Sequence, residues 1–112
     1  MQYMLLIYSN ENGAAEGDPD VLKRYGTFTE DVRENGKLVT ADRLQPTAAA
    51  TTVRIRNGET LVTDGPFAET KEQLGGYYLV DAADMDEALK IAKRIPSARY
   101  GSIEVRPVVV WE

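Results

Sequence analysis

The sequence contains neither cysteine nor histidine among its 112 residues. Without cysteine it can have no disulfide, no thiol nucleophile and no thiolate metal site, and nothing points to an oxidising compartment. Without histidine it lacks the one side chain whose unperturbed pKa lies near neutral pH. Any acid–base chemistry must then use a carboxylate with a raised pKa, a lysine with a lowered pKa or a tyrosine. We therefore expect a cytoplasmic protein without a cofactor.

Basic residues are also scarce. The chain has 13 lysines and arginines against 18 acidic residues, a net charge of -5. No basic cluster is present to neutralise a phosphate backbone, so nucleic acid is not expected as a partner. The apolar stretch at residues 1–8 has no basic residues before it and stops far short of a membrane span. We expect no membrane association either.

Short apolar runs predict six strands in one domain over residues 1–112. The runs cover residues 2–9, 37–45, 51–56, 59–63, 75–82 and 103–111. The first and the last two carry apolar side chains on both alternating sets, so both faces of these strands should be covered. Asn57-Gly58, between the third and fourth runs, supplies the positive φ angles of a tight turn. These two runs are therefore predicted to form a β-hairpin.

Two stretches between the strands have helical periodicity. The first begins at Asp18-Pro19, which suit the N-cap and first helical positions, and ends at Asn35-Gly36. The second begins at Asp84, with Glu87 placed for a capping box, and ends at Pro96. The apolar stripe of the first helix is predicted to be Leu22, Tyr25, Phe28, Thr29 and Val32. The stripe of the second is predicted to be Met85, Ala88, Leu89, Ala92 and Ile95.

The order of elements is strand, helix, strand, hairpin, strand, helix, strand. Without the hairpin this is βαββαβ, so we predict an α+β, ferredoxin-like antiparallel sheet with an inserted β-hairpin and both helices on one face. The opposite face then carries apolar side chains that need cover. We predict that a second copy packs sheet to sheet, giving a two-fold homodimer of the dimeric α-β barrel kind.

A long motif follows the hairpin. Residues 63–78 read TDGPFAETKEQLGGYY, which resembles the signature of the DGPF, or YCII-related, proteins. The opening YMLLIY at residues 3–8 and the closing IPSARYGSIEVRP at residues 95–107 support the resemblance. The similarity therefore spans nearly the whole chain.

The resemblance implies a ferredoxin-like fold, dimerisation and a superfamily whose functions are mostly unassigned. In its shorter YCII-like branch a histidine on the first helix pairs with an aspartate. The nearest position here is Tyr25, so that pair is not carried over. The DGPF branch is associated with extracytoplasmic-function sigma factors, which implies a regulatory or accessory role and a transcription-related partner.

Asp64 begins an Asp-Gly-Pro turn at the end of the second hairpin strand. One interpretation is structural, because Asp accepts local backbone hydrogen bonds, Gly allows unusual φ angles and Pro ends ladder pairing. The other is functional, because strand ends and long loops are where functional groups gather. In that case Asp64 is the first candidate for a general base or a carboxylate that orients a ligand.

Glu69, Lys71 and Glu72 form a cluster of alternating charge just after this turn. Such a cluster is commonly a solvated loop. Alternatively, Lys71 neutralises an anionic ligand or lowers the pKa of Asp64, for which the two groups must lie about 4 to 6 Å apart. Phe67 and Glu72 are further candidates for ligand contacts.

Tyr78 follows Gly75-Gly76, which marks a β-bulge, a close backbone approach or room for a ligand. Its aromatic ring suits a core or a dimer face as well as a binding site. Arg43 at a strand end is predicted either to form a salt bridge or to bind a ligand carboxylate in bidentate fashion. The acidic candidates for a metal site are Asp42, Asp64 and Glu72. Their spacing matches no metal-binding loop motif, so no metal site is predicted.

Two functions remain open. The first is a non-catalytic or accessory ligand-binding homodimer, in which residues 64–72 form the lip of a pocket or a partner surface. The second is a cofactor-free isomerase or hydrolase acting on a small anionic substrate. It would use Asp64 as base, Tyr25 as proton donor and Lys71 or Arg43 to bind the substrate. The missing histidine favours the first.

Overall fold

The computed structural model describes residues 1–13 and 19–111. In this part of the chain four strands form the main sheet and two form a separate hairpin. The strands are β1 Gln2–Ser9, β2 Leu38–Arg43, β3 Thr51–Arg56, β4 Glu59–Asp64, β5 Gln73–Asp81 and β6 Ser102–Pro107. The helices are α1 Val21–Glu34 and α2 Met85–Ala92, with 3₁₀ turns at Thr47–Ala49 and Pro96–Arg99. Neither of these helices has the length and apolar character that crossing a membrane requires.

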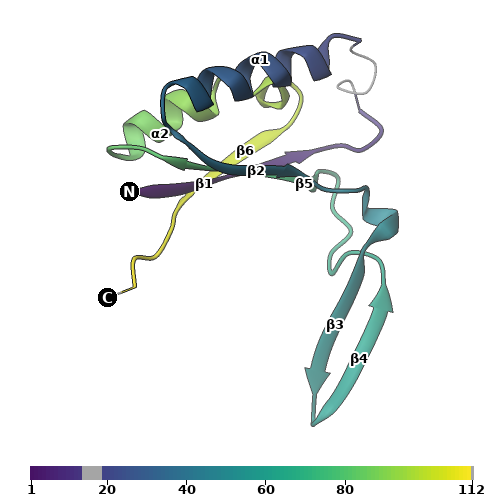
Figure 1. Cartoon of the computed structure of the whole chain (residues 1–112). Coiled ribbons are helices and arrows are strands. Elements are labelled where there is room, and N and C mark those ends of the chain that lie inside the picture. The colour runs from purple at the N-terminus through teal and green to yellow at the C-terminus, as the bar shows by residue number, and fades with distance from the viewer. Residues whose placement is uncertain (14–18, 112) are drawn as a thin grey trace.

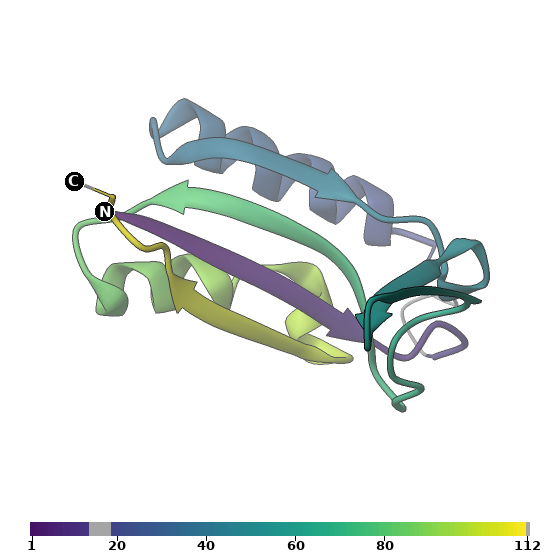
Figure 2. The same ribbon diagram turned by 90° about the horizontal axis from the view of Figure 1, so that it is seen from below.

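The main sheet has the strand order β2-β5-β1-β6, and every neighbouring pair is antiparallel. Both α-helices lie on one face of it (Figures 1 and 2). The β3–β4 hairpin is inserted between β2 and β5 and stays outside the sheet. The predicted ferredoxin-like α+β fold with an inserted hairpin is confirmed.

The core forms between the sheet and the helices. The central strand β1 alternates strictly, and its buried side chains are Tyr3, Leu5 and Ile7. Neighbouring β5 adds Tyr78 and Val80. The helices supply Phe28, Val32, Ala88 and Ile91 to the same cluster. Because β1 and β5 are paired along their whole length, these side chains form one continuous apolar layer.

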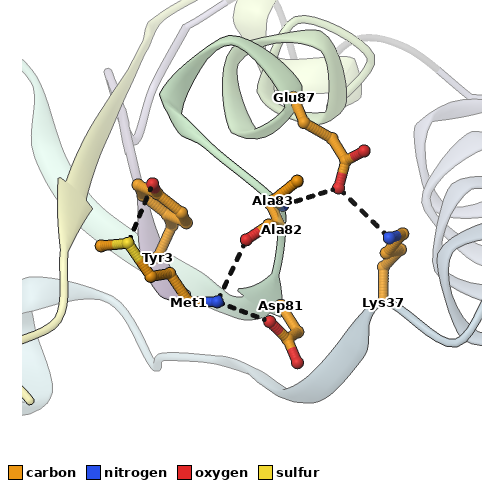
Figure 3. A network of polar contacts seen from close by, with 7 residues as sticks. All are labelled: Met1, Tyr3, Lys37, Asp81, Ala82, Ala83 and Glu87. Atoms are coloured by element: carbon orange, nitrogen blue, oxygen red, sulfur yellow. Dashed lines mark hydrogen bonds and ion pairs between the residues drawn. The ribbon is translucent and has the colours of Figure 1, made fainter.

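The start of α2 is fixed by the predicted capping box. The Asp84 carboxylate accepts a hydrogen bond from the backbone N–H of Glu87 at 2.9 Å. The Glu87 carboxylate accepts a hydrogen bond from the backbone N–H of Ala83 at 3.0 Å, and it forms an ion pair with the Lys37 ammonium group at 3.2 Å (Figure 3). These bonds satisfy donors that the first turn of a helix leaves free, and they connect α2 to the residue before β2.

The face of the sheet opposite the helices is open. Met4, Leu6 and Leu79 are on this face and are partly exposed. The Tyr77 hydroxyl donates a hydrogen bond to the Asp42 carboxylate at 2.7 Å, across β5 and β2. The described part of the chain places no helix on this side (Figure 1). The sheet therefore has apolar residues on both faces but helical cover on only one.

The hairpin leaves the body of the molecule on the side away from the helices (Figure 1). Its turn has φ angles of 53° at Asn57 and 77° at Gly58, the left-handed pair that the sequence predicts. The register pairs Val53 with Val62 and Ile55 with Thr60. At its base, Gly65 donates a backbone hydrogen bond to Ala50 at 2.7 Å. The hairpin is thus a two-stranded arm attached at one end.

Gly75-Gly76 has both of the structural roles that the sequence suggests. Ile7 pairs with Gly76 and Tyr8 with Leu74, so Gly75 is the extra residue of a β-bulge. A Cβ atom at Gly76 would lie 2.9 Å from the backbone oxygen of Asp42. The second glycine therefore allows β2 to approach β5 closely.

The first helix begins later than predicted. It starts at Val21, and Asp20 at the N-cap position makes no side-chain capping bond. Pro19 lies in a turn before it, while the predicted N-cap Asp18 is outside the described residues. Leu22 was predicted to be buried but is 68% exposed. The helix packs through its middle and last turns, where Phe28 and Val32 are buried, so its first turn has no core to face.

Two further predictions need correction. Strand β6 ends at Pro107 and not at residue 111, because proline has no N–H to donate to the ladder. The segment after it keeps one backbone bond, from Val108 N–H to the Gln2 carbonyl at 2.9 Å. Leu89 on α2 is 47% exposed, although its spacing predicts burial. The short helix of eight residues buries only a narrow stripe.

Candidate functional site

A small cavity of about 240 Å³ lies where three loops meet near the base of the arm. Its walls are residues 10–12 after β1, Thr47 in the first 3₁₀ turn, and residues 66, 69–71 and 73 between β4 and β5. Most of these residues are polar. The volume is slightly below that of sites for drug-sized molecules, so it suits a small ligand.

Glu11 forms one fixed wall of this cavity. Its carboxylate accepts a hydrogen bond from the backbone N–H of Thr47 at 2.8 Å and another from the Thr47 hydroxyl at 2.5 Å. These bonds to the charged form lower the pKa of Glu11 below its usual value, with the hydroxyl bond as the main cause. Glu11 is therefore ionised at neutral pH, and both of its oxygens are engaged.

Lys71 lies on the same cavity and is exposed. Among residues 1–13 and 19–111, no carboxylate lies within ion-pair distance of its ammonium group. The loop that holds it is shaped by Gln73, whose amide donates to the carbonyls of Ala68 at 3.3 Å and Thr70 at 3.0 Å. Within the described part of the chain, Lys71 is thus a positive charge without an ion-pair partner.

Asp64 is the last residue of β4 and is exposed. It is not among the residues that line the cavity. The next residue, Gly65, has a φ of 106°, and its carbonyl accepts a hydrogen bond from the Thr52 hydroxyl at 2.8 Å. No described residue donates a hydrogen bond to the Asp64 carboxylate. This carboxylate therefore does not cap its own turn, and it stays available to another group.

Tyr25 and Tyr78 lie elsewhere, in the layer between α1 and the sheet. The Tyr25 hydroxyl shares a hydrogen bond of 2.5 Å with Ser97, and the Tyr78 hydroxyl shares one of 2.6 Å with Thr29. Burial raises the pKa of both tyrosines, so both stay protonated at neutral pH. The Arg43 guanidinium lowers the pKa of Tyr25, against the larger effect of burial, which places Arg43 within electrostatic reach of Tyr25.

The remaining predicted residues lie apart from these groups. Phe67 is 79% exposed in the loop between β4 and β5. Glu72 accepts a hydrogen bond from the Ser102 hydroxyl at 2.8 Å, which ties the loop to the start of β6. The structure therefore brings Tyr25, Tyr78 and Arg43 into one neighbourhood and places Lys71 in another. The described residues contain no group of three acidic side chains that could hold a metal ion.

Glu11 and Thr47 are cavity residues that the sequence analysis did not identify. They are 36 residues apart and meet only because the chain returns to the end of β1 after β2. The polar run Asn10 to Asn12, placed directly after a buried strand, was the one local signal that could have pointed to them.

Comparisons with known proteins give a family match, a relative and a solved structure of similar fold. A family model described as the YCII-related domain matches residues 1–112. An uncharacterised protein of Rhizobium meliloti (strain 1021) is 44% identical over 118 residues, covering 100% of this chain and 95% of that protein. A solved structure of 5-chloro-2-hydroxyhydroquinone dehydrochlorinase (TftG) from Burkholderia phenoliruptrix AC1100, in complex with 2,5-dihydroxybenzoquinone, has a TM-score of 0.61. It is 11% identical, and the alignment covers 97% of this chain and 94% of that one, so the likeness concerns the fold alone.

Proposed function

Because this chain belongs to the YCII-related family, we propose that it is a small-molecule-binding protein that works as a homodimer. The proposed site is the cavity between residues 10–12, Thr47 and the loop from Pro66 to Gln73. The observation that carries the proposal is the Lys71 ammonium group, a charge on the cavity wall with no ion-pair partner among the described residues.

The charges of the walls favour a particular kind of ligand. A lysine ammonium group binds carboxylate and phosphate groups as a point charge. Glu11 and Glu69 on the same walls repel a second anionic group, while the side-chain amides of Asn10 and Asn12 offer further polar contacts. The proposed ligand is therefore a small molecule with one anionic group near Lys71 and hydroxyl or amine groups elsewhere.

The open face of the sheet supports the homodimer. It carries Met4, Leu6 and Leu79, and the described part of the chain leaves this side without helical cover (Figure 2). A second copy that packs sheet to sheet removes this apolar area from water on both copies at once. The site itself lies on loops at one end of the sheet, so dimerisation leaves each copy with its own cavity.

A thermal-shift screen of small carboxylates and phosphate esters tests the ligand proposal. A ligand that binds only the folded protein raises its melting temperature by mass action. For the strongest compound, we expect Lys71→Gln to weaken binding about tenfold or more, the usual loss for a charged contact. Lys93→Gln is the matched control, because Lys93 is an exposed lysine just after α2, far from the cavity walls in the sequence. Equal shifts in both variants contradict the site.

An enzymatic function is the second candidate. It keeps the residues proposed from the sequence, with Asp64 as general base, Tyr25 as proton donor and Arg43 or Lys71 as the substrate-binding cation. The structure places Tyr25 and Arg43 in a different neighbourhood from Lys71, which counts against a single site that uses all of them. The dehydrochlorinase structure with a similar fold supports a catalytic role. The observation that favours it is the Asp64 carboxylate, which accepts no hydrogen bond from the residues that the structure describes. A turnover assay on the compounds found in the screen separates the two functions. Conversion that Asp64→Asn abolishes supports the enzyme, and binding without conversion supports the first proposal.

For either function Arg43, Phe67, Glu72 and Tyr78 remain proposed ligand contacts. A cytoplasmic location and a role beside an extracytoplasmic-function sigma factor complete the proposal. Both rest on the sequence and its family resemblance. Co-purification of the tagged chain with extracytoplasmic-function sigma factors tests the regulatory link, and the absence of any sigma factor from the purified protein counts against it.

A further inference from the structure

The arm β3–β4 has one apolar face. Cross-strand pairing places Val53, Ile55 and Val62 on the same side of the hairpin, because Val53 faces Val62 and Ile55 lies two residues further along. These side chains are 64, 67 and 66% exposed. The opposite side carries Arg54 and Leu61 as a pair. A two-stranded hairpin alone is only marginally stable in water. Nothing in the hairpin itself shields these three aliphatic side chains from water, and such an exposed apolar patch marks a surface that binds a partner.

The arm and the C-terminal tail bracket the open face of the sheet. Both extend to the side away from the helices, the arm near one end of the strands and the tail near the other (Figures 1 and 2). The tail carries Val109, Val110 and Trp111, which are 67, 71 and 89% exposed. The arm and the tail, which both carry exposed apolar side chains, therefore project on the same side of the molecule as the open face of the sheet.

The single chain is also less compact than its length predicts. Its radius of gyration is 15.9 Å, whereas a compact domain of this length has one of about 13 Å. The projecting arm accounts for the difference in shape (Figure 1). A chain with an extended arm and a long apolar side is typical of a subunit whose compact unit includes a partner.

We propose that the arm is a dimer clasp, in which the face formed by Val53, Ile55 and Val62 packs on a second copy of this chain. A partner that covers arm, sheet and tail together must itself be apolar along a surface of the same length. A second copy of this chain has the same apolar surface. In a two-fold dimer, each arm packs on the partner while the partner's arm packs on it in the same way. The inference rests on the proposed homodimer and adds the arm to its interface.

The clasp would also support the proposed site. Asp64 pairs with Thr51 at the base of the arm, on the same side of the hairpin as Val62. Pro66, two residues later, is already a wall of the cavity. A partner that holds the arm therefore holds one lip of the cavity and lies next to the free Asp64 carboxylate.

The test compares two neighbouring residues on opposite sides of the arm. Val62→Asp places a carboxylate on the apolar face, whereas Leu61→Asp places one beside Arg54 on the other. Sedimentation of the full chain over a wide concentration range gives the dimer dissociation constant of each. We expect Val62→Asp to weaken the dimer at least tenfold and Leu61→Asp to change it about twofold or less.

The outcomes separate the clasp from the dimer. A wild-type chain that stays monomeric overturns both. A stable wild-type dimer that Val62→Asp leaves intact, or that both variants weaken equally, overturns the clasp and leaves the sheet-to-sheet dimer standing. Because the chain has no cysteine, Val62→Cys and Leu61→Cys can each carry an environment-sensitive dye. A blue shift on dimerisation at residue 62 alone supports the clasp without relying on a destabilising variant, and equal shifts oppose it.

Discussion

Thr47 donates two hydrogen bonds to the Glu11 carboxylate, from its backbone N–H at 2.8 Å and from its hydroxyl at 2.5 Å. The two residues belong to different loops, one after β1 and one after β2. Their pairing joins two walls of the cavity and keeps Glu11 ionised. The cavity thus has a fixed acidic wall, with Lys71 as its cationic group.

This pairing predicts a pH-dependent contribution to stability. The folded state lowers the pKa of Glu11, so the unfolded chain takes up the proton first as pH falls. The contribution is complete above the unfolded pKa of about 4.3 and is lost as pH falls through the lower folded value. Urea unfolding should therefore show wild type more stable than Glu11→Gln at neutral pH, with the gap closing below about pH 4. Glu34→Gln, at the exposed end of α1, is the control for the removal of one negative charge. A gap that stays constant with pH contradicts the assignment.

Two glycines should respond to alanine with opposite signs. Gly76→Ala puts a Cβ atom 2.9 Å from the Asp42 carbonyl oxygen, so β2 and β5 must move apart. We expect a loss of about 1 to 3 kcal/mol in the free energy of unfolding. Gly26→Ala meets no atom within 4 Å inside α1, and it should gain about 0.5 to 1 kcal/mol through helix propensity. Chemical denaturation measures both, and equal signs would count against the close approach of the strands.

The hydroxyl pair of Tyr25 and Ser97 should behave as a coupled unit. Ser97 is 6% exposed, so Tyr25→Phe leaves its hydroxyl buried without this partner, at a cost of about 1 to 3 kcal/mol. The double variant with Ser97→Ala removes both groups and should cost less than the sum of the single changes. A double-mutant cycle in urea measures the coupling. Strict additivity would mean that the hydrogen bond does not contribute.

Trp111 provides a direct signal for the partner. It is the single tryptophan of the chain and is 89% exposed. If a second copy covers the tail as well as the arm, its fluorescence should shift to the blue as the protein concentration rises and dimers form. Val62→Asp should move this transition to higher concentration. An emission maximum that does not change while sedimentation reports a dimer would remove the tail from the interface.

The sequence predicts the elements whose signals are local. The hairpin follows from Asn57-Gly58, since only a tight turn with positive φ angles needs that pair. The start of α2 follows from Asp84 and the residue three positions later, because a capping box is contained within one turn. The strand order follows from the succession of elements, since a βαββαβ chain has few unknotted solutions.

Other features depend on contacts that no local pattern contains. Glu11 and Thr47 meet across 36 residues of chain. Leu22 has the correct helical spacing, but burial also requires a core beneath the first turn of α1. The apolar face around Val62 is a further feature that the sequence predicts only in part. The alternation of a strand indicates that one face packs against something, but it does not indicate which molecule.

The central claim is that the cavity beside Lys71 binds a small anionic molecule. An NMR titration of the ¹⁵N-labelled protein with the strongest compound from the thermal-shift screen tests it most directly. We predict that the backbone amide signals of Glu11, Thr47 and Lys71 move together along one binding curve, and that Lys71→Gln shifts that curve to higher ligand concentration. Signals that move instead around Tyr25 and Ser97, with the loop signals unchanged, would contradict the account and place the ligand beneath α1.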